Sequence, residues 1–122
     1  MNTSAVDFIQ RLVRQFPILQ PLYEEHLADY DELLPHVFMG DFTRWLISVY
    51  SGDQKLGNAE STIRAILDYV ERAFVEGDEE LKELIAVSFL ENLPLPGEQH
   101  ASILRFLGSE LIREYLRIQG LA

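Results

Sequence analysis

Apolar side chains recur at helical spacing along nearly the whole chain. Between residues 4 and 16 they fall on one narrow face, and residues 58–76 repeat this spacing with a stripe made of Ile63, Ile66, Leu67, Val70 and Phe74. A three- to four-residue spacing places side chains on one side of a helix, whereas a half-buried strand alternates apolar and polar residues. No segment of the chain alternates in that way with turn signals at its ends, so the pattern predicts an all-α protein.

The stretch ELIAVSFLENLP, residues 83–94, differs from the other segments. A helix over residues 79–93 would present apolar side chains in nearly every direction around its axis, namely Leu81, Leu84, Ile85, Ala86, Val87, Phe89, Leu90 and Leu93. Helices that are apolar all round are surrounded by other helices. We therefore expect a helix at about 79–93 to form the buried centre of the molecule.

Prolines and capping residues mark the expected ends of the first helices. Ser4 is a plausible N-cap for the first helix, which should end near Pro17. Pro21 suits the first turn of a second helix, because its fixed backbone angle and missing N–H are tolerated there. Pro35 can start a helical turn that Gly40 stops.

Three Gly-Asp pairs, at 40–41, 52–53 and 77–78, are expected to mark helix boundaries, because glycine closes a helix and aspartate caps the next one. The last helix should run from about residue 98 to residue 118. In its apolar stripe Gly108 would let a neighbouring helix approach closely. The chain thus predicts a single domain, residues 1–122, of five to six helices arranged as antiparallel hairpins around the central helix.

The charge of the chain is strongly negative, with 20 Asp and Glu against 10 Lys and Arg and a formal net charge of -10. The acidic excess lies between residues 23 and 98. Because an acidic surface repels phosphate, we expect no nucleic-acid or membrane binding, and instead attraction of a basic protein partner. Acidity that only keeps the protein soluble is the alternative. The absence of cysteine and of any apolar leader at the N-terminus leads us to expect a cytoplasmic protein.

Seven residues after Pro21 form the candidate partner-binding site. They combine five carboxylates with two tyrosines and include no Lys or Arg: Tyr23, Glu24, Glu25, Asp29, Tyr30, Asp31 and Glu32. Tyrosine rings supply contact area at low entropic cost while carboxylates attract a basic surface. The alternative is a solvated face whose rings fold into the core. A second surface, with Phe106, Arg113 and Arg117 at the back of the last helix, could pair two copies or touch the first helix.

Candidates for chemistry are few. Glu91 would lie beside Ser88 on the central helix, where burial would raise the pKa of its carboxyl unless an arginine such as Arg44 or Arg105 paired with it. His26, His36 and His100 lie in separate segments and show no metal-ligand spacing. We therefore expect no catalytic residues, no metal and no cofactor.

Three stretches carry a resemblance: PHVFMGDFTRW at 35–45, GDEELKELIAVSFLENLP at 77–94 and LRFLGSELIREYL at 104–116. Together they resemble a family of small, uncharacterised bacterial helical domains. In character, being small, acidic and helical, the chain is also similar to the immunity proteins that accompany bacterial toxins. Neither resemblance implies catalytic residues.

These observations favour a non-enzymatic cytoplasmic binding domain that could sequester a basic partner, as an immunity protein does. A self-associating structural or regulatory subunit is the alternative. An enzyme that uses Glu91 is the third hypothesis, and it requires an enclosed pocket at that carboxylate.

Overall fold

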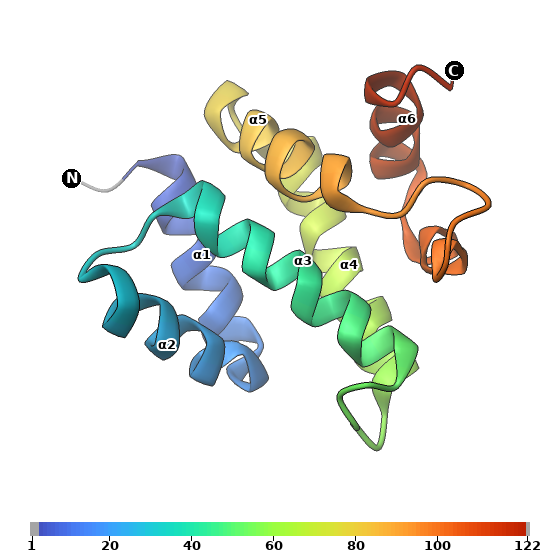
Figure 1. Ribbon diagram of the computed structural model, residues 1–122. Helices are drawn as coiled ribbons and strands as arrows, with labels where there is room; N and C mark the ends of the chain where they lie inside the picture. Colours follow the sequence, from blue (N-terminus) through green and yellow to red (C-terminus); the bar gives the residue numbers. More distant parts are fainter. Residues whose placement is uncertain (1–2, 122) are drawn as a thin grey trace.

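The computed structural model describes residues 3–121, and this part of the chain contains helices and loops but no strand (Figure 1). The α-helices are α1 (Ser4–Gln15), α2 (Gln20–Tyr30), α3 (Pro35–Ser51), α4 (Ala59–Glu76), α5 (Glu79–Ser88) and α6 (Ser109–Ile118). Three short 3₁₀ segments are η1 (Pro17–Leu19), η2 (Leu90–Asn92) and η3 (Ala101–Phe106). The all-α single domain predicted from the spacing of apolar residues is confirmed.

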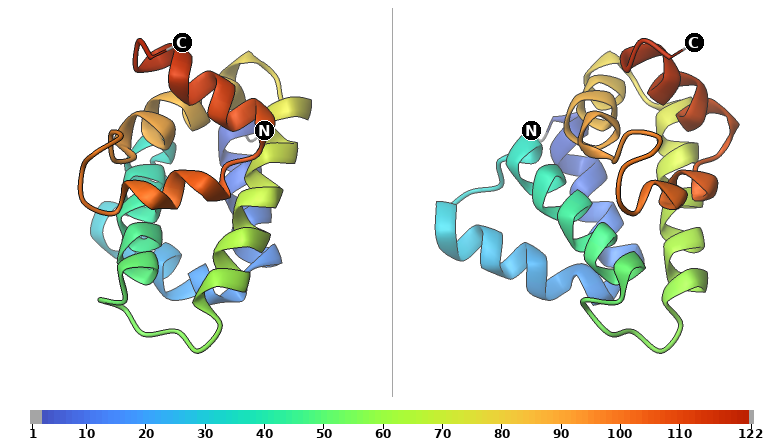
Figure 2. Two further views of the ribbon diagram at one scale, coloured as in Figure 1. Left: turned by 90° about the vertical axis from the view of Figure 1, so that its right-hand side faces the viewer. Right: turned by 45° about the vertical axis from the view of Figure 1, so that its right-hand side comes forward.

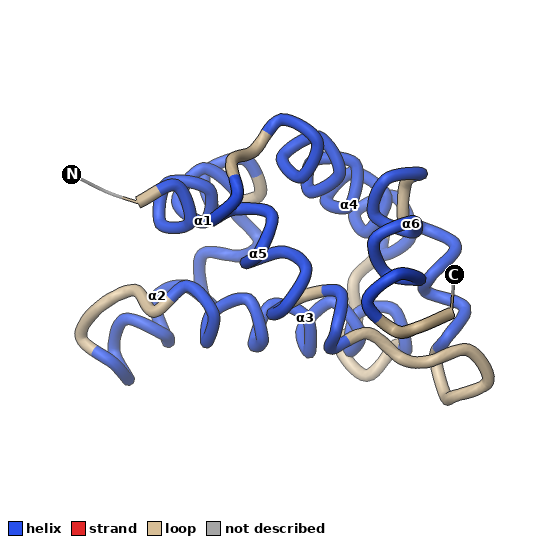
Figure 3. The backbone as a smooth tube through the Cα atoms, turned by 90° about the horizontal axis from the view of Figure 1, so that it is seen from above, coloured by secondary structure: helices blue, strands red, loops and turns tan. Residues whose placement is uncertain are grey.

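Helix α5 occupies the centre, as predicted, and contacts α1, α3, α4 and α6 (Figure 3). Its residues Leu84 and Ile85 are fully buried, and so are Phe89 and Leu90 just after it. The helix itself ends at Ser88 and continues as η2, so the expected single helix over 79–93 is too long. One side of α5 is exposed, at Lys82, Glu83 and Val87, so the helix is not buried all round as its apolar residues suggested.

The N-termini of α1 and α5 meet and share acceptors. Thr3, rather than Ser4, caps α1 by accepting a hydrogen bond from the Val6 N–H, so the expected Ser4 cap is wrong. The Ser4 hydroxyl instead donates to Asp78 Oδ1 (2.8 Å), and the Ala5 N–H donates to Glu80 Oε2 (2.9 Å). Carboxylates suit this place because both helix ends carry partial positive charge.

Two of the three Gly-Asp pairs are helix boundaries. Gly52 closes α3 with φ +87°, and Gly77-Asp78 alone links α4 to α5. The boundary expected at Gly40 is wrong, because α3 runs from Pro35 to Ser51 without a break. The buried residues of α3 continue at helical spacing on both sides of Gly40. The free energy gained by burying them exceeds the cost of about 1 kcal/mol that one glycine adds to a helix.

The helix expected over residues 98–118 is divided into η3 and α6. Its division falls at Gly108, where the Glu71 carboxylate of α4 accepts hydrogen bonds from the N–H groups of Glu110 and Leu111, both at 2.9 Å. A side chain at position 108 would collide with that carboxylate, since an added Cβ would lie 2.6 Å from Glu71 Cδ. Gly108 therefore permits the close approach that the sequence predicted. The group that approaches is the Glu71 carboxylate, which caps α6.

Candidate functional site

The predicted acidic segment lies on α2 and the turn that follows, at the outer edge of the molecule (Figure 2). We call its five exposed acids the α2 acidic face: Glu24, Glu25, Asp29, Asp31 and Glu32. No Lys or Arg within residues 3–121 forms an ion pair with any of them. Glu24 accepts one hydrogen bond, from the Gln20 amide. The structure thus brings five uncompensated negative charges together on α2 and the turn after it.

The two tyrosines of this segment have different surroundings. Tyr23 is half-buried, and its ring meets the buried Phe38 ring edge-on at 6.0 Å. Tyr30 is 46% exposed, and its ring centre lies 4.9 Å from that of His26. Tyr23 therefore packs on the core, and Tyr30 presents the larger surface to solvent.

A groove of about 400 Å³ separates α2 from α3. Its walls combine acids with aromatic rings: Leu22, Glu25, His26, Asp29, Tyr30, Asp41, Arg44, Trp45 and Ser48. Arg44 forms an ion pair with Asp41 of the same helix. The remaining charges of this α2–α3 groove, Glu25 and Asp29, are both negative.

His26 is the buried residue of α2, with 2% of its surface exposed. Its Nε2 accepts a hydrogen bond from the Leu34 N–H at 2.9 Å, which assigns the ring proton of a neutral imidazole to Nδ1. That Nδ1 is buried and has no hydrogen-bond partner in the described part of the chain. The burial of His26 and its bond to Leu34 could not be predicted from the sequence, because they depend on the path of the chain between α2 and α3.

A serine and a histidine also meet, at the end of α5. His36 Nδ1 lies 2.5 Å from Ser88 Oγ, and the Ser88 carbonyl accepts hydrogen bonds from Thr43 and Asn92. A nucleophilic serine needs a base that a third group orients and space for a substrate. Ser88 is buried, and within residues 3–121 no carboxylate bonds to His36. The pair joins the first turn of α3 to the end of α5.

Glu91 is exposed on η2 and forms no hydrogen bond or ion pair with the described residues. Neither arginine considered as a partner pairs with Glu91: Arg44 pairs with Asp41, and the Arg105 guanidinium lies 4.8 Å from the Phe106 ring centre. A groove of about 730 Å³ between α5 and α6 is lined by Glu79, Glu80, Lys82, Glu83, Ala86, Val87, Glu91, Glu114, Arg117 and Ile118. Glu91 thus lies at a solvent-exposed seam between α5 and α6.

Phe106 does not lie on the surface expected for self-association. It belongs to η3 and is 5% exposed, packed against the Tyr50 ring at 6.0 Å. The guanidinium groups of Arg64 and Arg105 each lie 4.8 Å from its ring centre. Placing Phe106 on an exposed face with the arginines of the last helix is therefore wrong.

Arg113 and Arg117 are exposed on α6, and each pairs with a glutamate one turn earlier, Glu110 and Glu114. Hydrogen bonding from Arg117 holds the pKa of the Glu114 carboxyl below its usual value. The charge of each arginine is therefore compensated by a neighbouring carboxylate. In the described part of the chain, no three His, Asp or Glu side chains are placed so as to hold a metal ion.

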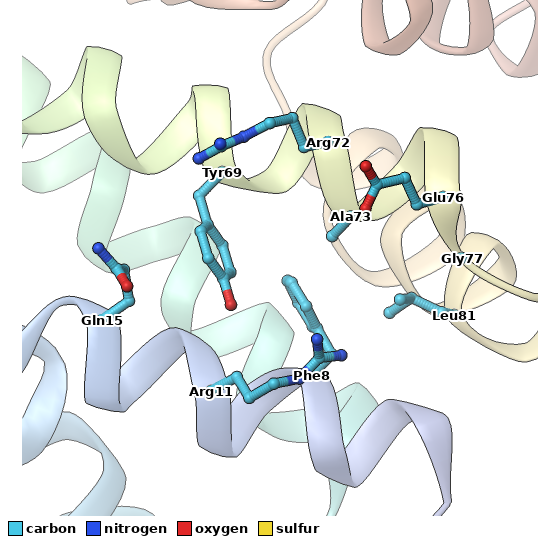
Figure 4. Close-up of a pocket in the computed structure, with 9 residues that line it drawn as sticks. All are labelled: Phe8, Arg11, Gln15, Tyr69, Arg72, Ala73, Glu76, Gly77 and Leu81. Atoms are coloured by element: carbon cyan, nitrogen blue, oxygen red, sulfur yellow. The ribbon is translucent and has the colours of Figure 1, made fainter.

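A third groove, of about 560 Å³, lies between α1 and α4 (Figure 4). It is lined by Phe8, Arg11, Gln15, Tyr69, Arg72, Ala73, Glu76, Gly77 and Leu81. Arg11 and Arg72 enter it from opposite helices, and neither has a carboxylate partner within residues 3–121. The sequence alone does not reveal this groove, because its residues come from segments about sixty positions apart.

The sequence profile of a domain of unknown function, DUF7674, matches residues 9–121. The chain belongs to this family. Membership of DUF7674 confirms the resemblance to an uncharacterised domain family, and the match covers more of the chain than the three motifs do. It gives no support to the likeness to immunity proteins. No curated protein and no solved structure matches this DUF7674 chain.

None of its described helices is both long and apolar enough to cross a membrane.

Proposed function

We propose that the protein is a non-enzymatic, cytoplasmic binding domain whose α2 acidic face recognises a basic protein. The observation that carries this proposal is the set of five exposed carboxylates on an outer helix and the turn after it, none with a Lys or Arg partner within residues 3–121. Like charges held together on a surface repel one another, and a cationic partner would relieve that repulsion. Sequestration of a basic toxin domain would be one instance of such binding.

The α2–α3 groove supplies a place for one basic side chain of the partner. Glu25 and Asp29 provide the charge, and the rings of Tyr30 and Trp45 provide faces on which a guanidinium can stack. The unpartnered Nδ1–H of His26 could donate to a backbone carbonyl of the partner if the Tyr30 ring turned aside. An arginine within an extended segment would satisfy all of these groups.

Two charge-matched triple variants test the proposal. The first, E24Q/E25Q/D29N, neutralises three of the five acids of the α2 acidic face; the second, D68N/E83Q/E91Q, neutralises three acids that are exposed elsewhere. Binding is measured by fluorescence anisotropy with a labelled nona-arginine peptide and with basic proteins encoded by neighbouring genes. Each lost charge-assisted contact weakens binding by about 1.5–3 kcal/mol, so we expect the first variant to bind at least about tenfold more weakly and the second to bind within about threefold of the parent protein.

Equal weakening in the two variants would show that net charge alone attracts the peptide, and the proposal would fail. Unchanged binding by the first variant would also contradict the proposal. Amide chemical-shift changes that map to α2 and the start of α3 would support the assignment independently of the variants.

A further inference from the structure

The α1–α4 groove differs in charge from the rest of this acidic molecule. Arg11 and Arg72 line it from opposite sides, and neither is used in an ion pair within residues 3–121 (Figure 4). Glu76 follows Arg72 by one helical turn, at the spacing that favours an ion pair. Arg72 instead extends toward Tyr69, with its guanidinium 6.0 Å from the ring centre. Arg11 donates to a backbone oxygen, that of Asp7 at 3.4 Å, so two guanidinium groups without a carboxylate partner in the described residues line one groove.

Tyr69 lines the groove together with these two arginines. Its ring stacks on the buried Phe8 ring at 6.3 Å and meets the Phe16 ring edge-on at 5.8 Å, so its orientation is fixed by packing. The hydroxyl points toward α1, between Arg11 and Gln15, and has no hydrogen-bond partner in the described residues (Figure 4). The groove therefore presents hydrogen-bond donors from three side chains beside a fixed aromatic face.

From this arrangement we propose that the α1–α4 groove binds a small organic oxyanion, a carboxylate or a phosphate ester that carries an apolar group. The guanidinium groups of Arg11 and Arg72 bind the oxyanion, because their planar donor pairs match the spacing of its oxygens. The apolar group lies against Tyr69 and Ala73. A volume of about 560 Å³ is within the range of sites for small molecules, about 300–1,000 Å³.

Glu76 fixes the direction in which such a ligand lies. Its exposed carboxylate lines the same groove, near the Gly77 end, and would repel a second anionic group placed there. The acidic group of the ligand thus lies toward Tyr69, and a neutral or cationic end lies toward Glu76. Neutralising this residue with E76Q is expected to strengthen the binding of a simple anion.

The test is a titration of the full chain with phenyl phosphate, benzoate and inorganic phosphate, followed by amide chemical shifts and calorimetry. R11Q and R72Q each remove one guanidinium from the groove. R14Q is the matched control: Arg14 lies on the same helix, is exposed, and does not line this groove. Since a hydrogen bond to a charged group contributes about 1.5–3 kcal/mol, we expect R11Q and R72Q to weaken phenyl phosphate binding by about tenfold or more, and R14Q to change it by less than about twofold.

Saturable shifts at residues 8, 11, 69 and 72, with phenyl phosphate binding more tightly than inorganic phosphate, would support the site. Benzoate binding as tightly as phenyl phosphate would identify the natural ligand class as carboxylates, and tighter phenyl phosphate binding would identify phosphate esters. An equal effect of R14Q, equal affinity for inorganic phosphate, or shifts confined to other surfaces would overturn the proposal. Y69F keeps the stacked ring and removes only the hydroxyl, and a weakening of a few-fold is expected without loss of the fold.

Discussion

Glu71 connects two helices through one carboxylate. It lies half-buried on α4, and its two oxygens accept the N–H groups of Glu110 and Leu111, 39 and 40 residues along the chain. Those N–H groups have no acceptor inside α6, because the first turn of a helix leaves its donors free. Gly108 makes room for this capping interaction.

The substitution G108A should therefore act through Glu71. Its new Cβ would displace the carboxylate and leave the first turn of α6 without acceptors, at a cost of about 1–2 kcal/mol in the free energy of unfolding. Urea denaturation of G108A, E71A and the double variant measures the coupling between the two positions. We expect G108A to have little further effect once Glu71 is replaced.

The backbone of Gly108 has φ -72°, which any residue adopts, so steric conflict with Glu71 is the only source of the predicted cost. Fully additive effects of G108A and E71A would contradict the assignment.

Asp78 makes stability depend on pH. The hydrogen bond from the Leu81 N–H, followed by the one from the Ser4 hydroxyl, lowers the pKa of the Asp78 carboxyl below its usual value. Because the folded protein holds this group ionised more strongly than the unfolded chain does, its stabilising effect is present at neutral pH. It is lost as the pH falls below about 4, the unfolded value, through the folded one.

The substitution D78N should reduce this acid dependence. Asparagine remains a good N-cap but does not titrate, so we expect D78N to be less stable than the parent at pH 7 and to lose less stability on acidification. Thermal unfolding followed by circular dichroism from pH 7 to about pH 2 measures both effects. Parallel pH profiles for the two proteins would show that Asp78 makes no such contribution.

Among the helices, α3 shows how tertiary packing overrides a local signal. Gly40 predicted a boundary, yet the buried residues Phe38, Met39, Phe42 and Leu46 keep one face of α3 continuous across it. Helix propensities of single residues cannot predict this continuity, because it depends on the packing of α3 against α5 and α1. Helix α4 has a continuous apolar stripe and a glycine just after its last residue, and its observed bounds agree with the predicted ones.

Gly40 is therefore a weak point within a helix, and G40A should stabilise the protein. An added Cβ would meet only the Arg44 guanidinium at 3.7 Å, an ordinary contact distance. Alanine lowers the entropy of the unfolded chain, so the free energy of unfolding should rise by about 0.5–1 kcal/mol. G108A serves as the opposite control, and destabilisation by G40A in urea denaturation would contradict the continuous helix.

For the whole molecule, the net charge of -10 means that acidic side chains outnumber basic ones and repel one another. All four ion pairs between Arg and Asp or Glu in residues 3–121 lie within single helices, so they do not connect one element to another. Burial of apolar residues and capping by carboxylates hold the helices together against this mutual repulsion.

Stability should accordingly rise with salt. Raising the ionic strength from about 0.01 M to about 0.15 M shortens the screening length from about 30 Å to about 8 Å, which weakens repulsion between distant acids. We expect the urea midpoint to increase over this range in the parent protein and to increase less in E24Q/E25Q/D29N. A midpoint that falls with salt would show that attractive charge pairs dominate instead.

Periodicity predicted the elements whose signal is local. The stripes of α1 and α4, the apolar segment at the centre and the boundaries at Gly52 and Gly77 all follow from residues a few positions apart. The acidic segment was also recognisable, because its five carboxylates are close in sequence, on α2 and the turn after it.

Contacts between distant segments could not be predicted. The meeting of His36 with Ser88, the cap from Glu71 and the two arginines of the α1–α4 groove depend on how whole helices pack. Glu91 shows the same limit: a carboxylate that follows an apolar run can be buried or exposed, and only the end of α5 at Ser88 places it in solvent.

The bonds from Ser4 to Asp78 and from Ala5 to Glu80 join positions 74 and 75 residues apart. During synthesis on the ribosome, the beginning of α1 leaves the exit tunnel long before its acceptors do. Helix α1 therefore lacks these two hydrogen bonds until the chain has been synthesised beyond Glu80. The nascent chain reaches its native arrangement late, and a chaperone that shields apolar segments would find the residues of α1 available throughout that interval.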